Sequence, residues 1–147
     1  MKTLALALFC LFSTTVFSQE VKTSDVPKPV LTEFKGLHPE IHKVKWTHVE
    51  EGYRASFLVK GVKNSVLIDS FGNWLDSRTD VTVNSLPDSV MIYMRKNNPG
   101  ATIGQIMKVV PNSSFVFWYV TSGGHYYVFD EAGSYLRTDE EEKMAED

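Results

Sequence analysis

The sequence predicts an α+β protein in which one helix-and-four-strand unit occurs twice. Similar features recur at an interval of about 60 positions, and each copy has one helical stretch followed by four strand-like stretches. Asp25-Val26-Pro27 aligns with Ser85-Leu86-Pro87, and residues 68–75 align with 129–136. We therefore predict a tandem duplication, with units at 26–84 and 85–138 and with an antiparallel sheet carrying its helices on one face.

Each unit is expected to open with a helix. Pro27 and Pro87 suit a first helical turn, and Asp25 and Ser85 are capping residues just before them. Apolar residues then recur at helical spacing, which predicts one buried stripe on each helix. These residues are Val30, Leu31, Phe34 and Leu37 in the first copy, and Val90, Met91 and Met94 in the second.

Strand signals follow each helix, separated by short connections in which glycine supplies the backbone freedom that a hairpin needs. In two equivalent turns we expect Asp69 and Asp130 to bond their own turn backbone and so hold Gly72 and Gly133 in place. Paired carboxylates for acid–base work are the less favoured alternative. The predicted strands are 43–48, 53–60, 64–69, 73–78, 102–109, 114–120, 125–130 and 134–138.

The N-terminus is typical of a secretory signal peptide. Lys2 precedes a short apolar run, and small residues lie near Ser18, so we place cleavage after Ser18 and predict a periplasmic or secreted protein. A lipoprotein anchored at Cys10 is not expected, because Phe9 precedes that cysteine. The run is too short to span a bilayer, and we predict no integral membrane segment in the mature chain. Residues 19–25 would be its N-terminal segment and 139–147 a solvated acidic tail.

Composition disfavours several classes of function. Removing Lys2 from the 15 Lys and Arg leaves 14 against 18 Asp and Glu, a net charge of −4, so a nucleic-acid partner is not expected. Cys10 is the one cysteine, so the mature chain has no thiolate zinc site, cysteine nucleophile or disulfide. His38, His42 and His48 lie within eleven residues and could in principle collect a metal, but no HExxH-like pair is present, so ordinary exposed histidines are the favoured interpretation. No nucleophile or phosphate-binding motif occurs. We predict a protein that is not an enzyme, with no metal and no cofactor.

Alternation along the strands predicts a surface that binds a protein or peptide. Carrying the register of 53–60 to the second copy places Phe115, Phe117 and Tyr119 against the helices. The opposite face would then be apolar, and exposed aromatic patches commonly mark contact sites. The predicted partner-binding residues are Trp118, Tyr126, Tyr135, Trp74, Val116, Val120 and Val128. Burial of this patch by the other copy or by a homodimer is the open alternative.

The chain also resembles a known family. Val26-Pro27, Val30, Phe34, Pro39, Trp46, Phe57 and the hairpin 68–75 resemble the PepSY-like proteins, which are common among exported proteins of Bacteroidetes-type bacteria. The resemblance covers about residues 26–138. It implies a fold like that of the beta-lactamase inhibitor protein.

The function that this resemblance implies is an exported binding module, which would bind or inhibit an envelope or secreted protease or another hydrolase. A periplasmic carrier of a small molecule or peptide is the alternative. One departure concerns disulfides, because the beta-lactamase inhibitor protein has them and the mature chain here has no cysteine. None of that inhibitor's target-contacting residues matches a position in this chain.

Overall fold

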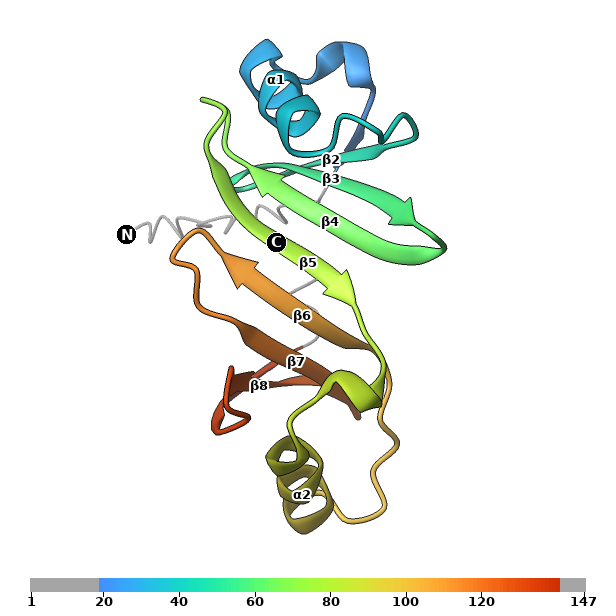
Figure 1. Cartoon of the computed structure of the whole chain (residues 1–147), viewed down its shortest axis with the longest axis vertical. Coiled ribbons are helices and arrows are strands. Elements are labelled where there is room, and N and C mark those ends of the chain that lie inside the picture. Colours follow the sequence, from blue (N-terminus) through green and yellow to red (C-terminus); the bar gives the residue numbers. More distant parts are fainter. Residues whose placement is uncertain (1–18, 141–147) are drawn as a thin grey trace, which may run out of the picture.

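The computed structural model describes residues 19–140, which form one antiparallel sheet of nine strands with two helices. The strands lie in chain order from β1 to β9, so every neighbouring pair is antiparallel and the two predicted units share a continuous sheet. In Figure 1, α1 and α2 lie at opposite ends of the long axis, with β5 midway between them. The strands are β1 (Gln19–Val21), β2 (Lys45–Val49), β3 (Gly52–Val59), β4 (Val62–Ile68), β5 (Trp74–Asp80), β6 (Ile106–Pro111), β7 (Phe117–Ser122), β8 (His125–Asp130) and β9 (Tyr135–Glu140).

The order of elements agrees with the sequence prediction, and the α+β class is consistent with it. A short 3-10 turn, a helix and four strands occur twice, with the turns η1 (Thr23–Asp25) and η2 (Val83–Ser85) before the helices. Strand β1 was not predicted, and it extends the edge by pairing with β2. The predicted tail began at Asp139, but Asp139 and Glu140 belong to β9. The predicted signal peptide, 1–18, lies outside the described residues.

Helices α1 (Lys28–Leu37) and α2 (Asp88–Asn97) begin directly after Pro27 and Pro87. The predicted capping role of Asp25 and Ser85 is wrong, because these residues end the 3-10 turns and neither helix has a side-chain cap bond. The helices end where Pro39 and Pro99 follow, since a proline disfavours helical geometry in the residue before it. No helix among residues 19–140 is long and apolar enough to cross a membrane.

Each helix packs its apolar stripe onto the same side of the sheet, which we call the helix face. Val30 and Phe34 of α1 pack against Trp46, Ala55, Phe57, Val66 and Ile68. Val90 and Met94 of α2 pack against Ile106, Trp118, Val120 and Phe129. Fully burying a side chain of this size contributes about 1.5–3 kcal/mol, so these two clusters hold the helices to the sheet.

The predicted face of the residues around β7 is wrong. Trp118 and Val120 lie under α2 with Val116 beside them, whereas Phe117 and Tyr119 alternate onto the other side. The reason is the length of the β6–β7 hairpin, which is longer than the equivalent β2–β3 hairpin of the first copy. Trp46 pairs with Ala55 in the first copy, whereas Ile106 pairs with Val120 in the second. The extra residues between β6 and β7 are odd in number, and an odd shift turns every side chain of a strand to the opposite face.

Candidate binding surface

The side of the sheet opposite both helices, which we call the open face, carries the candidate site. Strand alternation places Arg54, Ser56 and Leu58 of β3 on it, and the registers carry this face across to β9. Charged and polar residues dominate its β3–β5 part. Apolar and aromatic residues dominate its β6–β8 part, namely Met107, Val109, Phe117, Tyr119, Tyr126 and Val128.

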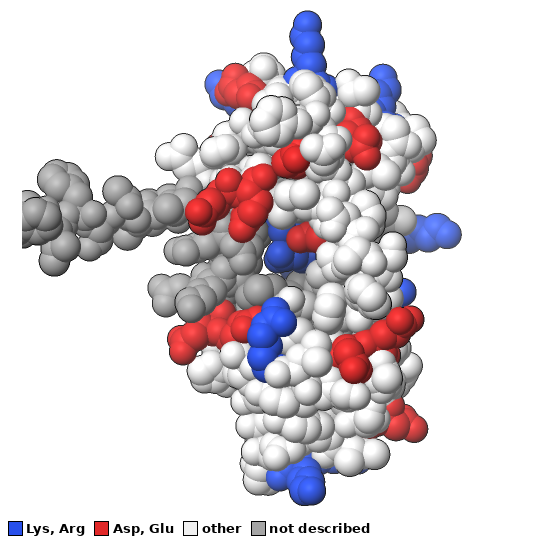
Figure 2. All heavy atoms as spheres, turned by 90° about the vertical axis from the view of Figure 1, so that its left-hand side faces the viewer, with Lys and Arg blue, Asp and Glu red and all other residues white. Residues whose placement is uncertain are grey.

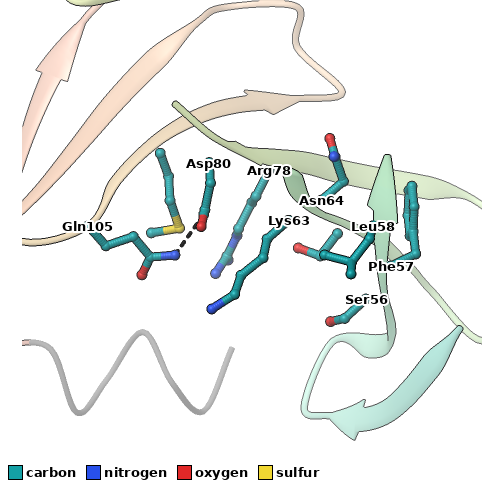
Figure 3. Close-up of a pocket in the computed structure, with 10 residues that line it drawn as sticks. Ser56, Phe57, Leu58, Lys63, Asn64, Arg78, Asp80 and Gln105 are labelled. Atoms are coloured by element: carbon teal, nitrogen blue, oxygen red, sulfur yellow. Dashed lines mark hydrogen bonds between the residues drawn. The ribbon is translucent and has the colours of Figure 1, made fainter. Parts of the chain in front are cut away.

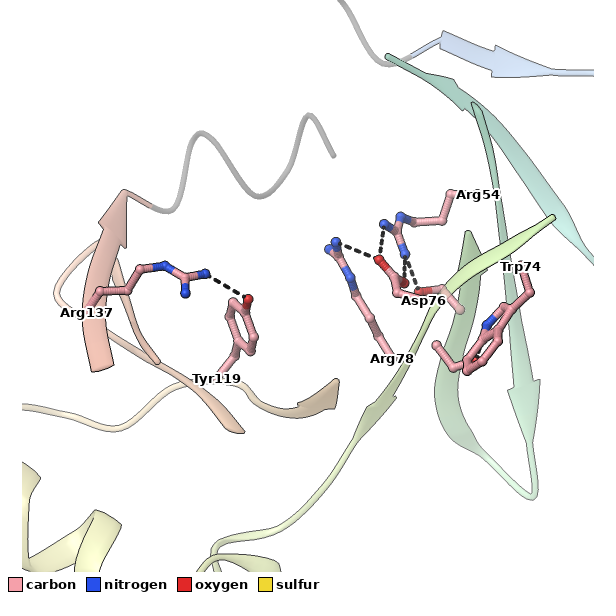
Figure 4. Close-up of polar contacts among 8 residues, drawn as sticks. Arg54, Trp74, Asp76, Arg78, Tyr119 and Arg137 are labelled. Atoms are coloured by element: carbon pink, nitrogen blue, oxygen red, sulfur yellow. Dashed lines mark hydrogen bonds and ion pairs between the residues drawn. The ribbon is translucent and has the colours of Figure 1, made fainter. Parts of the chain in front are cut away.

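Two arginines share one carboxylate at the centre of this face (Figure 4). Arg54 donates from both terminal nitrogens to the carboxylate oxygens of Asp76, at 2.9 and 3.2 Å. Arg78 donates to the Oδ2 atom of Asp76 at 3.4 Å. The three side chains are only 9%, 14% and 14% exposed in the order Arg54, Asp76, Arg78. The two guanidinium groups and the carboxylate therefore form one charged cluster, which is largely shielded from solvent.

A pocket of about 360 Å³ opens beside this cluster, where the two halves of the sheet meet. Leu58, Lys63, Arg78 and Asp80 line it from the first half, and Gln105 and Met107 line it from the second. The side chains of Lys63, Arg78 and Gln105 point into the same space in Figure 3. Gln105 donates to the carboxylate of Asp80 at 2.7 Å, which fixes that carboxylate against the wall. The pocket therefore offers cationic groups next to an aliphatic wall.

The apolar part of the open face forms a third cluster, whose members are almost entirely buried apart from the partly buried Phe117. Met107 is 7% exposed, Tyr119 is 8%, Tyr126 is 7% and Val128 is 0%. The Tyr119 hydroxyl accepts a hydrogen bond from Arg137 of β9 at 3.1 Å, which is also drawn in Figure 4. Arg137 in turn donates to Asp139 at 2.9 Å. A charged bridge thus borders the aromatic cluster on the β9 side.

The predicted partner-binding residues do not form one surface. Tyr126 and Val128 lie on the open face, as predicted, but both are buried. Trp118, Val116 and Val120 belong to the core beneath α2, and the Trp118 indole donates to the Glu131 carbonyl at 3.2 Å.

The other two predicted aromatics, Trp74 and Tyr135, lie on the helix face. Trp74 packs against the first core and donates to the Ser77 hydroxyl at 3.0 Å. Tyr135 is stacked on Tyr93 of α2, with ring centroids 4.5 Å apart. These side chains support the two helices.

The two equivalent turns have the geometry of capped hairpins. The Oδ1 atom of Asp69 accepts hydrogen bonds from the backbone N–H of Phe71 and Asn73, and Oδ2 accepts from the Asn73 side chain. The Asn73 side-chain hydrogen bond, followed by backbone bonds, lowers the pKa of Asp69. Asp130 accepts from the backbone of Ser134 in the second turn. Gly72 and Gly133 have φ of +92° and +84°, which disfavour other residues there.

Other chemistry is not assembled within residues 19–140. No group of three or more His, Cys, Asp or Glu side chains among them is placed to hold a metal ion. His38 caps the end of α1 and packs on Phe57, while His48 packs on Tyr53. Each of these two histidines therefore packs against an aromatic ring of the fold.

Solved structures of several Bacteroides proteins resemble the chain in fold. A DUF2874 family protein from Bacteroides uniformis ATCC 8492 has a TM-score of 0.70 at 24% identity, over 78% of this chain and 88% of that one. A protein from Bacteroides eggerthii DSM 20697 described as a candidate periplasmic protein has a TM-score of 0.71 at 19% identity, with the same coverage. A BLIP-like protein from Bacteroides fragilis NCTC 9343 has a TM-score of 0.61 at 21% identity, over 78% and 86%.

These comparisons support a BLIP-like fold for this chain. No protein-family model and no curated protein matches the sequence. The PepSY-like resemblance therefore stays a prediction, and the shared features are those of architecture.

Sequence reasoning missed the central charged cluster, although a signal for it was present. Asp76, Arg78 and Asp80 alternate along β5, so they share one face of that strand. What the alternation does not reveal is their partner, because Arg54 lies two strands away and reaches Asp76 over β4.

Proposed function

We propose that this protein is a non-catalytic binding module of the bacterial envelope that holds a protein partner on its open face. One observation carries the proposal: both helices cover the same side of a nine-stranded sheet, and no described helix lies on the other side. That side joins a buried aromatic cluster to a charged cluster and a pocket. Leu58 and Lys63 are exposed at the pocket and would contact a partner bound there.

The BLIP-like fold supports a partner that is itself a protein, such as an envelope or secreted protease or another hydrolase. At 21% identity the likeness concerns architecture alone. The side chains of this chain's own open face would therefore determine which partner binds. An address in the periplasm agrees with the predicted signal peptide and with the description of the Bacteroides eggerthii neighbour.

Two exposed residues on opposite sides of the molecule allow a matched test. Leu58 is 61% exposed on the open face beside the pocket, and Ile92 is 62% exposed on α2. Each substitution, Leu58→Asp or Ile92→Asp, is made in the form beginning at Gln19. Each variant is then used to capture proteins from the envelope fraction of its own bacterium. We expect Leu58→Asp to lose the captured partner at least tenfold and Ile92→Asp to retain it. Equal retention by both variants would contradict binding through the open face.

A carrier of a small molecule or peptide is the second candidate, and the pockets favour it. The open-face pocket of about 360 Å³ lies within the size range of ligand sites, and a second pocket of about 350 Å³ lies between α1 and the segment that leads into β2. Mass spectrometry of the native protein recovered after export would show a bound ligand. A uniform apo mass would disfavour the carrier.

We also infer that units 26–84 and 85–138 arose by tandem duplication. The same order of elements supports this, as do the near-identical backbone angles of Pro27 and Pro87, φ −57° in both and ψ 143° and 141°. The equivalent bonds of Asp69 and Asp130 in their turns support it as well. The longer β6–β7 connection would then be a later change in the second copy.

A further inference from the structure

The hairpin that joins β3 to β4 exposes apolar side chains at its tip. Leu58 is 61% exposed, Val59 is 37% and Val62 is 41%. Val59 pairs with Val62 across a turn of two residues, and Leu58 pairs with Lys63. In Figure 1 this tip projects beyond the other labelled strands on the right-hand side of the sheet. The tip is therefore placed to contact a large surface.

These apolar side chains lie on both sides of the hairpin. Val59 is two residues from Phe57, which packs under α1, so Val59 and its partner Val62 point to the helix side. Leu58 points to the open side. A rigid protein bound to one side would leave the apolar groups of the other side in water. The interfacial layer of a bilayer surrounds an inserted tip, so it buries both sides at once.

The charges of the hairpin are all positive. Residues 55–68 contain two lysines, Lys60 and Lys63, and no Asp or Glu, and both lysines are exposed. Lys60 has φ of +50° and Gly61 has φ of +81°, the geometry of a two-residue turn in which Asn-Gly or Asp-Gly is preferred. A lysine in the first of these positions is strained and adds nothing to the fold. A role in binding explains a cation at the outermost point of the hairpin.

Acidic groups gather at the opposite end of the sheet. Because every neighbouring pair of strands is antiparallel, four connections lie at the end away from the β3–β4 tip. They are 50–51, 69–73, 112–116 and 131–134. These four connections contain no Lys or Arg, and their acidic residues are Glu50, Glu51, Asp69 and Glu131. Figure 2 shows the molecule from this side, with acidic side chains along much of its length. An anionic surface would therefore attract the hairpin end and repel the other end.

We propose that the β3–β4 hairpin binds an anionic lipid surface, with Val59 and Val62 among the headgroups and Lys60 beside the lipid phosphates. One lysine next to such a surface strengthens binding about fivefold. Burial of the two valines adds to this attraction, and contributions of this size give a reversible attachment. The contact holds the protein at the membrane with its acidic end outward.

Vesicle flotation tests the proposal with pure lipids. The form beginning at Gln19 is mixed with vesicles of phosphatidylcholine alone, or of equal parts of phosphatidylcholine and phosphatidylglycerol. We expect binding to the phosphatidylglycerol vesicles alone, and added salt should weaken it. Equal binding to both kinds of vesicle, or binding to neither, would overturn the proposal.

Lys60→Asn separates lipid binding from folding. Asparagine is favoured at this positive φ, so the variant should unfold at a higher urea concentration than the parent protein. Its affinity for the anionic vesicles should nevertheless fall about fivefold. Lys35→Gln, which removes an exposed lysine of α1, should bind as the parent does. An unchanged affinity of Lys60→Asn, or an equal loss in Lys35→Gln, would contradict a specific role of the hairpin.

Val59→Thr with Val62→Thr tests the apolar contact, because threonine keeps the branched shape and the strand preference of valine. The double variant should lose affinity for the vesicles several-fold. Phe71→Ser is the control, since Phe71 is 86% exposed at the other end of β4, and it should bind as the parent does. Full binding by the double valine variant would rule out insertion of the tip.

A protein partner is distinguished from lipid in the same variants. The vesicles contain no protein, and the valine substitutions leave Leu58 in place, so the double variant should retain a partner captured through the open face. Loss of that partner without any vesicle binding would mean that the hairpin contacts a protein, and it would overturn the lipid proposal. A failure of the capture experiment alone would leave vesicle binding intact.

Discussion

Asp76 holds two guanidinium groups together, and its neutralisation should measurably destabilise the sheet. Asp76→Asn keeps the side-chain size but leaves Arg54 and Arg78 facing each other, with 9% and 14% of their side chains exposed. Removing one partner of a buried ion pair costs about 3–5 kcal/mol, whereas an exposed pair is worth at most about 1 kcal/mol. Because some exposure remains and water screens the charges, we expect a loss of about 2–4 kcal/mol in the free energy of unfolding.

Urea unfolding at neutral pH, followed by tryptophan fluorescence, measures this loss. The double variant Arg54→Gln with Asp76→Asn should regain about 1 kcal/mol or more relative to Asp76→Asn alone, because one of the two like charges is removed. Added salt should also stabilise Asp76→Asn more than the parent protein. A cost below about 1 kcal/mol, or strictly additive effects of the two substitutions, would refute the view that the three side chains act as one buried charge cluster.

Three further substitutions test other parts of the structure. Trp118→Ala should lower the free energy of unfolding in urea by about 3–5 kcal/mol, since the indole lies in the core under α2. A loss near zero would contradict this core position and favour an exposed indole. Gly133→Ala should destabilise more than Gly61→Ala, because both have positive φ but the new methyl group at 133 would meet Ser89 and Pro87 while 61 is open; equal costs would contradict this packing. Asp69→Asn tests the lowered pKa of Asp69. This lowered pKa contributes stability that is fully present above the pKa of the carboxyl group in the unfolded chain, and that contribution is lost as the pH falls through the pKa in the folded chain. The variant should therefore be less stable than the parent at pH 7, with the difference vanishing in acid, and a difference independent of pH would be evidence against the turn bonds.

Much of the architecture could be predicted from local patterns. The helices followed from the spacing of Val30 and Phe34, and of Val90 and Met94, which bury one stripe each. The hairpins followed from glycines such as Gly72, because a positive φ is a local requirement.

The predicted binding surface depended on register, and it was wrong at β7 for that reason. Two aligned strands of similar composition look equivalent in sequence, but their faces depend on the number of residues in the hairpin before them. Ser114, with φ of +66°, lies in the connection that sets this number. Phe117 and Tyr119 consequently took the open positions that were predicted for Trp118 and Val120.

The sequence by itself determined the α+β class, the order of the two helices and of strands β2 to β9, and the glycine turns, because these depend on propensities and spacings within about ten residues. Only the tertiary structure decided which aromatics are core and which lie on the open face, and that Arg54 meets Asp76. Those outcomes depend on pairing between strands, where one residue of register moves a side chain from one side of the sheet to the other.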